Sequence, residues 1–439
     1  MGRERAGAAR WGVAILSGTL ALAATAAPSA APELISRVPG NQGADGASQD
    51  AAVTSSGKFV AFRSRATNLV DEDLNGDADV FVRDLKTGAT TRVSVDSEGG
   101  EGNGDCHFPA ISANGRFVLF SSDADDLVAD DGNESRDVFL HDRKTGETRR
   151  VSVDEGGGEG EDSSSLSGSS LSTNGRYAVF LSSASNLGPA DGAFQDVFWK
   201  DLRTGTVILV SRDPQGGPAD GPSQDPSISA NGRFVAFTSS ATNLTGDDDG
   251  NLSRDVFVFD RKTGTTRRAS VDSEGGDADA DSYEPTVSSN GRIVAFYSSA
   301  SDLVPLDTNG DYDVFVHDSG TGTTRRVSVD PDGNQVPGPS YTPALSQNGK
   351  VVVFYAEANG LVPEDQNGTG DVYSVDLATG AIRLLSATAQ GEVGDGYSHL
   401  LPTSLAGNGK WVSFSSDATN LSNQDRNGST TDVFLVPAR

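Results

Sequence analysis

The sequence predicts an all-β fold, a seven-bladed β-propeller of four-stranded antiparallel blades, and three observations carry this prediction. A turn of the form S-x-N-G-R/K, followed by apolar residues, recurs seven times at intervals of 57 to 60 residues. The residues between the turns form short apolar runs and turn signals without amphipathic helical periodicity, which is typical of propeller blades. The last copy lacks its final strand, and a matching segment lies near the N-terminus. The glycines of the turns are Gly57, Gly115, Gly175, Gly232, Gly291, Gly349 and Gly409.

Each repeat is expected to supply four strands, and the fourth repeat shows the pattern. A short entry strand at 226–229 precedes the N-G turn, and the strand at 234–237 is apolar throughout. Such a strand predicts burial on both faces, between two neighbouring blades. A third strand begins at Asp255 in the sequence D-V-F, and a D-x-x-T-G turn leads to the fourth strand. Arg267 and Arg268 in that strand fit an outermost position, where charge protects an exposed edge.

The two ends of the chain are expected to meet in the last blade. The seventh repeat ends soon after its third strand at 432–436, whereas residues 35–42 resemble 327–335 with one residue deleted. We therefore expect residues 34–38 to complete the last blade, so that the ring has no open sheet edge. The propeller then forms one domain over residues 33–439.

The N-terminus has the layout of a secretory signal peptide. Arg3, Arg5 and Arg10 precede an apolar run at 11–27, and small residues follow. We expect cleavage after residue 26, with an alternative end near residue 30. No other stretch approaches the ~20 apolar residues of a membrane span. The sequence thus predicts a secreted, periplasmic or cell-envelope protein without a transmembrane segment.

The charge of the chain limits its partners. The formal net charge is −28, and residues 1–26 carry three arginines and one glutamate, so their removal makes it more negative. Such a charge argues against nucleic acid or an anionic membrane as partner. It is compatible with cation binding or a basic partner. We expect a monomer. Cys106 is the single cysteine, which excludes an intramolecular disulfide.

Because successive strands of a blade run in opposite directions, successive loops emerge on opposite faces of the ring. The loops between second and third strands share one face with the interblade loops, and both are rich in Asp and Glu. This face is expected to be strongly acidic. The opposite face is expected to collect Lys58, Arg116, Arg176, Arg233, Arg292, Lys350 and Lys410.

The loops of the form D-x-N-G-x-x-D are candidate calcium sites. They place oxygen ligands at alternate positions, as calcium loops do, but they lack the final Glu of an EF-hand. The alternative is a structural turn, in which Asn-Gly makes the bend and the Asp side chains cap backbone amides. The third repeat has lost the Asn-Gly and keeps Asp196, which favours a structural role for the last Asp. The best candidate ligands are Asp73, Asn75, Asp77, Asp79, Asp307, Asn309, Asp311 and Asp313. Weaker versions are Asp131/Asn133/Asp137, Asp249/Asn251/Asp255, Asp365/Asn367/Asp371 and Asp425/Asn427/Asp432.

The mouth of the central channel is the second candidate site. The residues that lead into the innermost strands differ from repeat to repeat. We expect them to line the mouth of the channel on the acidic face. Convergent His, Tyr and carboxylate groups at a concave site suit ligand binding or acid–base chemistry. The alternative is that they are ordinary turn residues under little packing constraint. The candidates are Asp50, His107, Asp225, Tyr283, Glu284, Tyr341 and His399.

The S-x-N-G-R-x-V-A-F core followed by the D-x-x-T-G turn resembles the TolB-like β-propeller family, over about residues 33 to 439. The resemblance implies the propeller fold. It leaves the activity open, since propellers of this family serve as binding scaffolds, protein-contact modules and accessory domains of peptidases. The small α/β domain that precedes the propeller in Tol-system members is not expected here. The G-x-S-x-G hydrolase domain of the peptidases is not expected either.

Two functions remain after the motifs are considered, since no H-E-x-x-H, Walker or paired C-x-x-C motif is present. The first is a non-catalytic, extracytoplasmic binding scaffold, stabilised by calcium if any D-x-N-G loop binds it. It would present the acidic face to a protein or glycan partner. The second is a hydrolase or lyase that acts on a small or glycan ligand at the channel mouth. It would use His107, His399, Tyr283 and Glu284.

Overall fold

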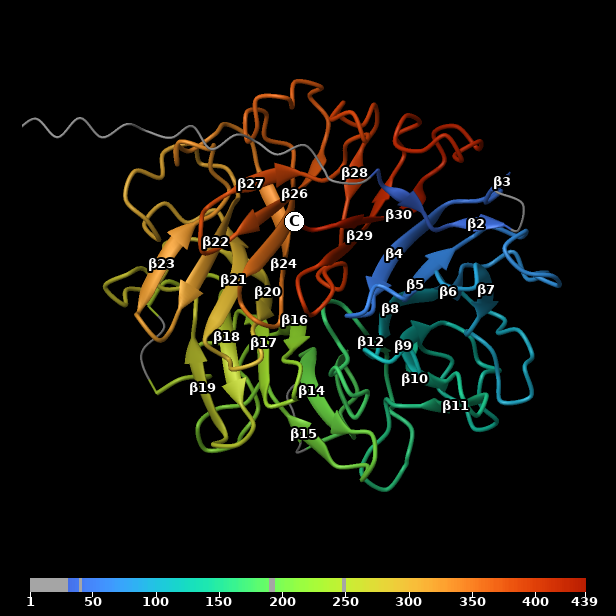
Figure 1. The fold of residues 1–439 in the computed structure, drawn as a ribbon. Helices are drawn as coiled ribbons and strands as arrows, with labels where there is room; N and C mark the ends of the chain where they lie inside the picture. The colour runs from blue at the N-terminus through green and yellow to red at the C-terminus, as the bar shows by residue number, and fades with distance from the viewer. Residues whose placement is uncertain (1–30, 39–41, 189–193, 247–249) are drawn as a thin grey trace, which may run out of the picture.

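The computed structural model is a seven-bladed propeller, as the repeat predicted (Figure 1). It describes residues 31–38, 42–188, 194–246 and 250–439. The expected signal peptide at 1–26 lies outside the described residues. Seven antiparallel sheets of four strands surround a central axis, and the described residues contain no helix. No helix of the described part of the chain is therefore long and apolar enough to cross a membrane.

Blades 1 to 6 each take four consecutive strands. Blades 1 and 2 contain β4 (Ser48–Val53), β5 (Phe59–Ser64), β6 (Asp79–Asp84), β7 (Ala89–Arg92), β8 (Cys106–Ile111), β9 (Phe117–Ser122), β10 (Asp137–Asp142) and β11 (Glu147–Arg150). Blades 3 and 4 contain β12 (Ser164–Ser165), β13 (Tyr177–Ser182), β14 (Asp196–Asp201), β15 (Val207–Leu209), β16 (Ser223–Ile228), β17 (Phe234–Ser239), β18 (Asp255–Asp260) and β19 (Thr265–Arg268). Blades 5 and 6 contain β20 (Ser282–Val287), β21 (Ile293–Ser298), β22 (Asp313–Asp318), β23 (Thr323–Arg326), β24 (Ser340–Leu345), β25 (Val351–Ala356), β26 (Asp371–Asp376) and β27 (Ile382–Leu384). Blade 7 combines β28 (Ser398–His399), β29 (Trp411–Ser416), β30 (Asp432–Pro437) and β1 (Glu33–Leu34).

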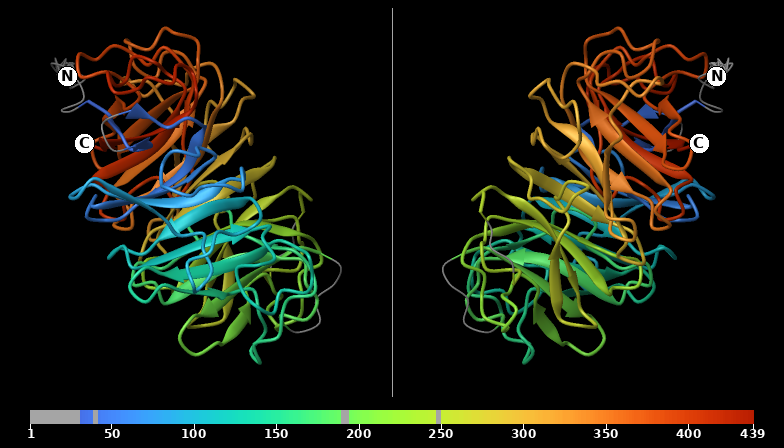
Figure 2. Two further views of the ribbon diagram at one scale, coloured as in Figure 1. Left: turned by 90° about the vertical axis from the view of Figure 1, so that its right-hand side faces the viewer. Right: turned by 90° about the vertical axis from the view of Figure 1, so that its left-hand side faces the viewer.

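The closure of the ring by an N-terminal strand is confirmed. The blue strand β1 lies beside the red strands of blade 7, and Leu34 pairs with Phe434 of β30 (Figures 1 and 2). The Ile35 amide donates to the Val433 carbonyl at 2.8 Å. The chain then leaves the blade, since β2 (Arg37–Val38) pairs with β3 (Gln42–Gly43) in a separate two-stranded sheet. The pairing with β30 thus involves residues 33–35.

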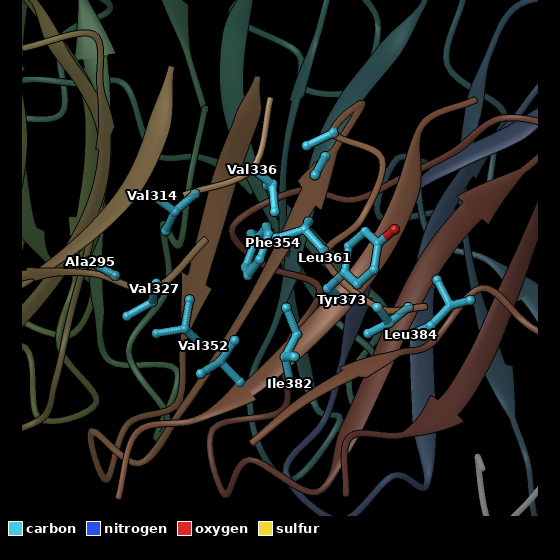
Figure 3. Close-up of a cluster of buried hydrophobic side chains, with 14 of the residues drawn as sticks. Ala295, Val314, Val327, Val336, Val352, Phe354, Leu361, Tyr373, Ile382 and Leu384 are labelled. Carbon is cyan, nitrogen blue, oxygen red and sulfur yellow. The ribbon is translucent and has the colours of Figure 1, made fainter. Parts of the chain in front are cut away.

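The core lies between neighbouring blades, because the middle strands are apolar on both faces. In β17 the side chains of Val235, Ala236 and Phe237 are all fully buried. Between blades 5 and 6, side chains such as Val314 and Phe354 belong to one buried cluster (Figure 3). Each blade therefore depends on its neighbours for burial of its apolar surface.

In each blade, a buried hydrogen bond fixes the first residue of the third strand. In blade 1, Ser94 Oγ donates to Asp79 Oδ1 at 2.5 Å and accepts from the Val80 amide at 3.0 Å. This arrangement gives the last Asp of each D-x-N-G loop a structural role. The seven pairs are Asp79–Ser94, Asp137–Ser152, Asp196–Ser211, Asp255–Ser270, Asp313–Ser328, Asp371–Ser386 and Asp432–Ser36.

Five of the seven turn glycines let an aromatic ring of the preceding blade approach, namely Gly57, Gly115, Gly175, Gly232 and Gly291. Gly115 has φ of +71°, and a Cβ placed on it would lie 2.2 Å from Phe59 Cδ2 of blade 1. Gly115→Ala is therefore expected to lower the free energy of unfolding by about 2–5 kcal/mol, through backbone strain and overpacking. Gly146→Ala is the matched control, because Gly146 also has a positive φ but nothing within 4 Å. Urea unfolding that shows equal losses for the two variants would contradict the packing role.

Candidate functional site

A backbone bulge distorts the innermost strand of five blades at the channel mouth. In β16 the register shifts between Gln224 and Ser227, and Asp225 between them has φ of +52°. A left-handed conformation at a residue other than glycine costs about 1–3 kcal/mol and is common at functional sites. A bulge also redirects the side chain that it carries. The bulged residues are Asp50, Phe108, Asp225, Glu284 and Thr342.

Proline follows the bulged residue in four of these five strands. Because proline has no amide hydrogen, it needs no partner where the strand pairing is interrupted. This is a sequence signal for the bulge. The prolines are Pro109, Pro226, Pro285 and Pro343.

Three of the bulged residues, Phe108, Asp225 and Glu284, line a cavity of about 200 Å³ at the channel mouth. Blade 7 contributes to it by an irregular segment after β28, in which Pro402 approaches Gly168 of blade 3. A Cβ on Gly168 would lie 2.9 Å from the Pro226 carbonyl and 3.7 Å from the Pro402 Cβ, so only glycine fits here. The cavity is lined by Phe108, Ser167, Gly168, Asp225, Glu284, Pro285, Leu401 and Pro402.

The far end of the channel is narrow and hydrogen-bonded. Pro402 also lines a second cavity of about 60 Å³, which reaches Gln347. Gln347 Oε1 accepts from the Ala230 amide at 2.8 Å and from Ser289 Oγ at 3.1 Å. The Gln347 side chain thus links blades 4, 5 and 6 at this end. The larger cavity, nearer the interblade loops, is the better place for a ligand.

Two carboxylates dominate the electrostatics of the larger cavity. Burial raises the pKa of Asp225 to about 6, although the Glu284 backbone amide and Arg254 oppose the shift. Burial, together with repulsion from Asp225, raises the pKa of Glu284 to about 7. The Oε2 atom of Glu284 is buried and has no hydrogen-bond partner in the described ranges. No basic side chain is among the residues that line the cavity, all of which belong to the described part of the chain.

Asp50 is the equivalent bulged residue of blade 1. It is buried, and burial raises its pKa to about 6 against the attraction of Arg63. Asp50 is not among the residues that line the cavity. Of the seven residues predicted for the channel mouth, the structure therefore brings Asp225 and Glu284 together in it.

The remaining four predicted residues lie elsewhere. His107 Nε2 is 3.1 Å from Asp123 Oδ2, and Tyr283 donates to Asp281 Oδ2 at 2.7 Å. The pKa of His107 is lowered, mainly by burial. Tyr341 stacks on another tyrosine, and His399 lies against Tyr397 with ring centroids 5.6 Å apart. His107, Tyr283 and Tyr341 each stand one residue before a bulged residue, so alternation of side chains turns them away from the bulged side chain. His399 ends β28 in blade 7, where the strand pairing shows no bulge.

A row of aromatic rings runs across blades 5, 6 and 7 beside the mouth. Neighbouring centroids lie 5.3–5.8 Å apart along the row. Sequence reasoning missed most of these rings because they come from different strands and loops. Tyr397, next to His399 at the end of the row, is 40% exposed. The row consists of Tyr283, Tyr297, Tyr312, Tyr341, Tyr355, Tyr397 and His399.

An arginine occupies the centre of the two best D-x-N-G loops. In blade 5, Arg326 Nη1 lies 3.2 Å from Asp307 Oδ1 and 2.8 Å from Asp313 Oδ2. In blade 1, Arg92 lies 3.8 Å from Asp73 and 3.5 Å from Asp79. These arginines come from the fourth strand, where the sequence suggested exposed edge charges. The last residue of that strand, an arginine in both blades, instead points into its own blade.

The other predicted ligands of these loops serve the turn. Asn75 Oδ1 accepts from the Asp77 amide at 2.9 Å, and Asn309 Oδ1 accepts from the Asp311 amide at 3.1 Å. Asp311 Oδ2 accepts from the Gly338 amide at 2.9 Å. The bonds to Asn75 and Asn309 are the Asx-type bonds of the structural alternative, whereas the bond to Asp311 joins the loop to the interblade segment.

The opposite face is largely neutralised by its own ion pairs. Arg233 Nε and Nη2 contact the two carboxylate oxygens of Asp260 at 2.8 and 2.6 Å. Sequence reasoning counted the arginines of the N-G-R turns without the aspartates of the D-x-x-T-G turns that face them. The pairs are Arg116–Asp142, Arg176–Asp201, Arg233–Asp260 and Arg292–Asp318.

Comparison with known proteins supports the fold. No family model matches the chain, and no curated protein matches it. An oligogalacturonate lyase in complex with manganese superposes with a TM-score of 0.52 at 13% identity, over 93% of this chain and 96% of that one. The β-propeller domain of the trilobed protease from Pyrococcus furiosus gives 0.52 at 11% identity, over 89% and 95%. TolB from Acinetobacter baumannii gives 0.39 at 14%, over 88% and 82%. The chain is thus similar in fold to β-propellers, including those of an enzyme and of a protease.

Proposed function

We propose that this chain is a non-catalytic, extracytoplasmic binding scaffold whose channel-mouth cavity receives a basic side chain of a protein partner. The observation that supports this proposal is the close approach of Asp225 and Glu284 in a cavity that no basic lining residue neutralises. Burying a carboxylate without a partner is costly, and a bound cation removes that cost. The bulged backbone that holds both residues fixes them in advance of binding.

An arginine side chain suits this cavity better than a lysine. Its planar guanidinium donates to two carboxylates through separate N–H groups. The Phe108 ring and the prolines that line the cavity provide apolar contacts for the aliphatic part of the side chain. The acidic face around the mouth would attract a basic partner and raise the rate of association.

N-acetyl-arginine amide is a direct probe of this proposal. We expect it to bind to the mature chain at pH 8, and Glu284→Gln to weaken binding at least tenfold in calorimetry. Asp50→Asn is the matched control, because it changes the same bulge position in a blade that does not line the cavity. The neutral isostere N-acetyl-citrulline amide should not bind. Equal affinities for Glu284→Gln and the unmodified protein would contradict the proposal.

The affinity for this probe is expected to depend on pH. Both carboxyls have raised pKa values, about 6 for Asp225 and about 7 for Glu284, so both take up protons as the pH falls from 8 to 5. A cation binds the ionised pair, hence affinity should fall steeply over this range. Calorimetry at several pH values measures it. An affinity that stays constant from pH 8 to pH 5 would exclude this pair as the binding group.

A hydrolase or lyase at the channel mouth is the second candidate. It now depends on Asp225 and Glu284, because two adjacent carboxyls of different pKa suit acid–base chemistry. In a panel of glycan and ester substrates, the enzyme hypothesis expects turnover that Glu284→Gln abolishes and His399→Ala preserves. Turnover that survives Glu284→Gln would exclude this site.

A further inference from the structure

The D-x-N-G loop of blade 7, residues 425–432, lacks the partner that stabilises the acidic groups of the other loops. In blades 1, 2 and 5 an arginine guanidinium lies between the first and the last aspartate. In blade 6, Leu384 stands in the fourth strand where those blades have the arginine, and it pairs with Tyr373. The hydroxyl of Tyr373 donates to Asp365 instead. In blade 7 the same two positions are Leu34 and Phe434, neither of which carries a donor.

An insertion also changes the turn of the blade 7 loop. Its two aspartates are seven positions apart, against six in blades 1, 2, 5 and 6. In five other loops the Asn Oδ1 accepts from the amide two residues later, at 2.8–3.1 Å. In blade 7, Asn427 Oδ1 is buried and has no hydrogen-bond partner among the described residues. The Asn427 side chain is nevertheless fixed, because its Nδ2 donates to the Ala44 carbonyl at 3.0 Å.

Asp432 supplies a second oxygen without a partner. Its side chain is fully buried, and Oδ1 accepts from Ser36 Oγ at 2.5 Å. Its Oδ2 is buried and makes no hydrogen bond within the part of the chain that the structure describes. Within the described ranges, no ion pair joins Asp425 or Asp432 to a basic side chain. Burial raises the pKa of Asp432 to about 7 and nearby Asp425 adds to the shift, whereas the side chains of Ser36 and Asn427 oppose it.

We propose that Asp425, Asn427 and Asp432 form a calcium-binding site in the blade that joins the two ends of the chain. Carboxylate and amide oxygens are the ligands that calcium prefers, and calcium tolerates an irregular set completed by water. The cation would replace the guanidinium that blades 1, 2 and 5 place between the equivalent aspartates. This site is separate from the channel-mouth cavity and does not depend on the proposed function.

Thermal melting of the chelator-treated mature chain tests the site. At pH 8, 5 mM Ca²⁺ is expected to raise the melting temperature by about 3 °C, because a ligand that binds only the folded state stabilises it. Mg²⁺ at the same concentration should give a smaller rise, since it demands regular octahedral geometry. Calorimetry with Ca²⁺ should find a single site. An unchanged melting temperature with Ca²⁺ would overturn the proposal.

Three variants locate the effect. Asp425→Asn should abolish the calcium-dependent rise, whereas the matched Asp307→Asn in blade 5 should preserve it, because Arg326 fills that loop. Leu34→Arg supplies the guanidinium that four other blades carry at this register position, so it should fold and lose the calcium response. The proposal is wrong if Asp425→Asn and Leu34→Arg both keep the calcium-dependent rise in melting temperature. It is equally wrong if Asp307→Asn loses it.

Discussion

A chain that begins at residue 39 is expected to be about 5 kcal/mol less stable than one that begins at residue 31, because it lacks the strand that closes blade 7. Leu34 and Ile35 are 1% and 0% exposed, and burying each such side chain contributes about 1.5–3 kcal/mol. Loss of Ser36 leaves Asp432 Oδ1 without its donor, which adds about 1–3 kcal/mol. The loss also exposes the edge of β30 to pairing with other chains.

Urea unfolding and size-exclusion chromatography measure the two consequences of this truncation. The shortened chain should unfold at lower urea concentration and associate with itself through the open edge. The chain that begins at residue 31 is the control and should do neither. If both chains unfold at the same urea concentration as monomers, β1 does not stabilise the ring.

The second large effect is expected at Arg326, in the D-x-N-G loop of blade 5. Its side chain is 8% exposed and contacts Asp307 and Asp313, which are 5% and 1% exposed. Removal of one partner from a buried ion pair costs about 3–5 kcal/mol, so Arg326→Ala should be strongly destabilising. Arg292→Ala is the control from the same blade, since Arg292 is 47% exposed in its pair with Asp318. An exposed pair contributes only about 0–1 kcal/mol.

Chemical denaturation of both variants decides between a structural and a superficial role for the loop arginines. A small loss for Arg326→Ala, similar to that for Arg292→Ala, would mean that the acidic loop does not need its guanidinium. Circular dichroism of both variants checks that the blades remain folded.

The ring was predictable because its chemistry is local and repeated. The N-G turn, the apolar strand and the aspartate that starts the third strand follow one another in the same order in all seven repeats. The closing strand was predictable as well, because residues 35–42 copy a segment of another repeat. The structural role of the last Asp was visible in Asp196, which persists where the loop has changed.

The cavity was not predictable in full, because it depends on contacts between distant repeats. Asp225 and Glu284 were found from their positions in the repeat. Their neighbours Leu401 and Pro402 come from an irregular segment of blade 7 that has no equivalent pattern. The bulge also turns the preceding residue, such as His107, away from the mouth, and alternation alone did not indicate which of two adjacent residues lines the cavity.

The arginine clusters were missed for a related reason. The fourth strand is outermost in the sequence pattern, which suggests exposed arginines. Strand pairing places Arg326 opposite Phe315, beside the loop that precedes the third strand. The charge therefore lies inside the blade, and a set of acidic residues that resembles a calcium loop is partnered by the protein itself.

A crystal structure of the chain that begins at residue 31, soaked with N-acetyl-arginine amide, would show whether the cavity receives a guanidinium. We expect guanidinium density between the carboxylates of Asp225 and Glu284, with the aliphatic part against Phe108, and no such density in Glu284→Gln crystals. A ligand bound elsewhere on the ring while this cavity holds only water would contradict this expectation.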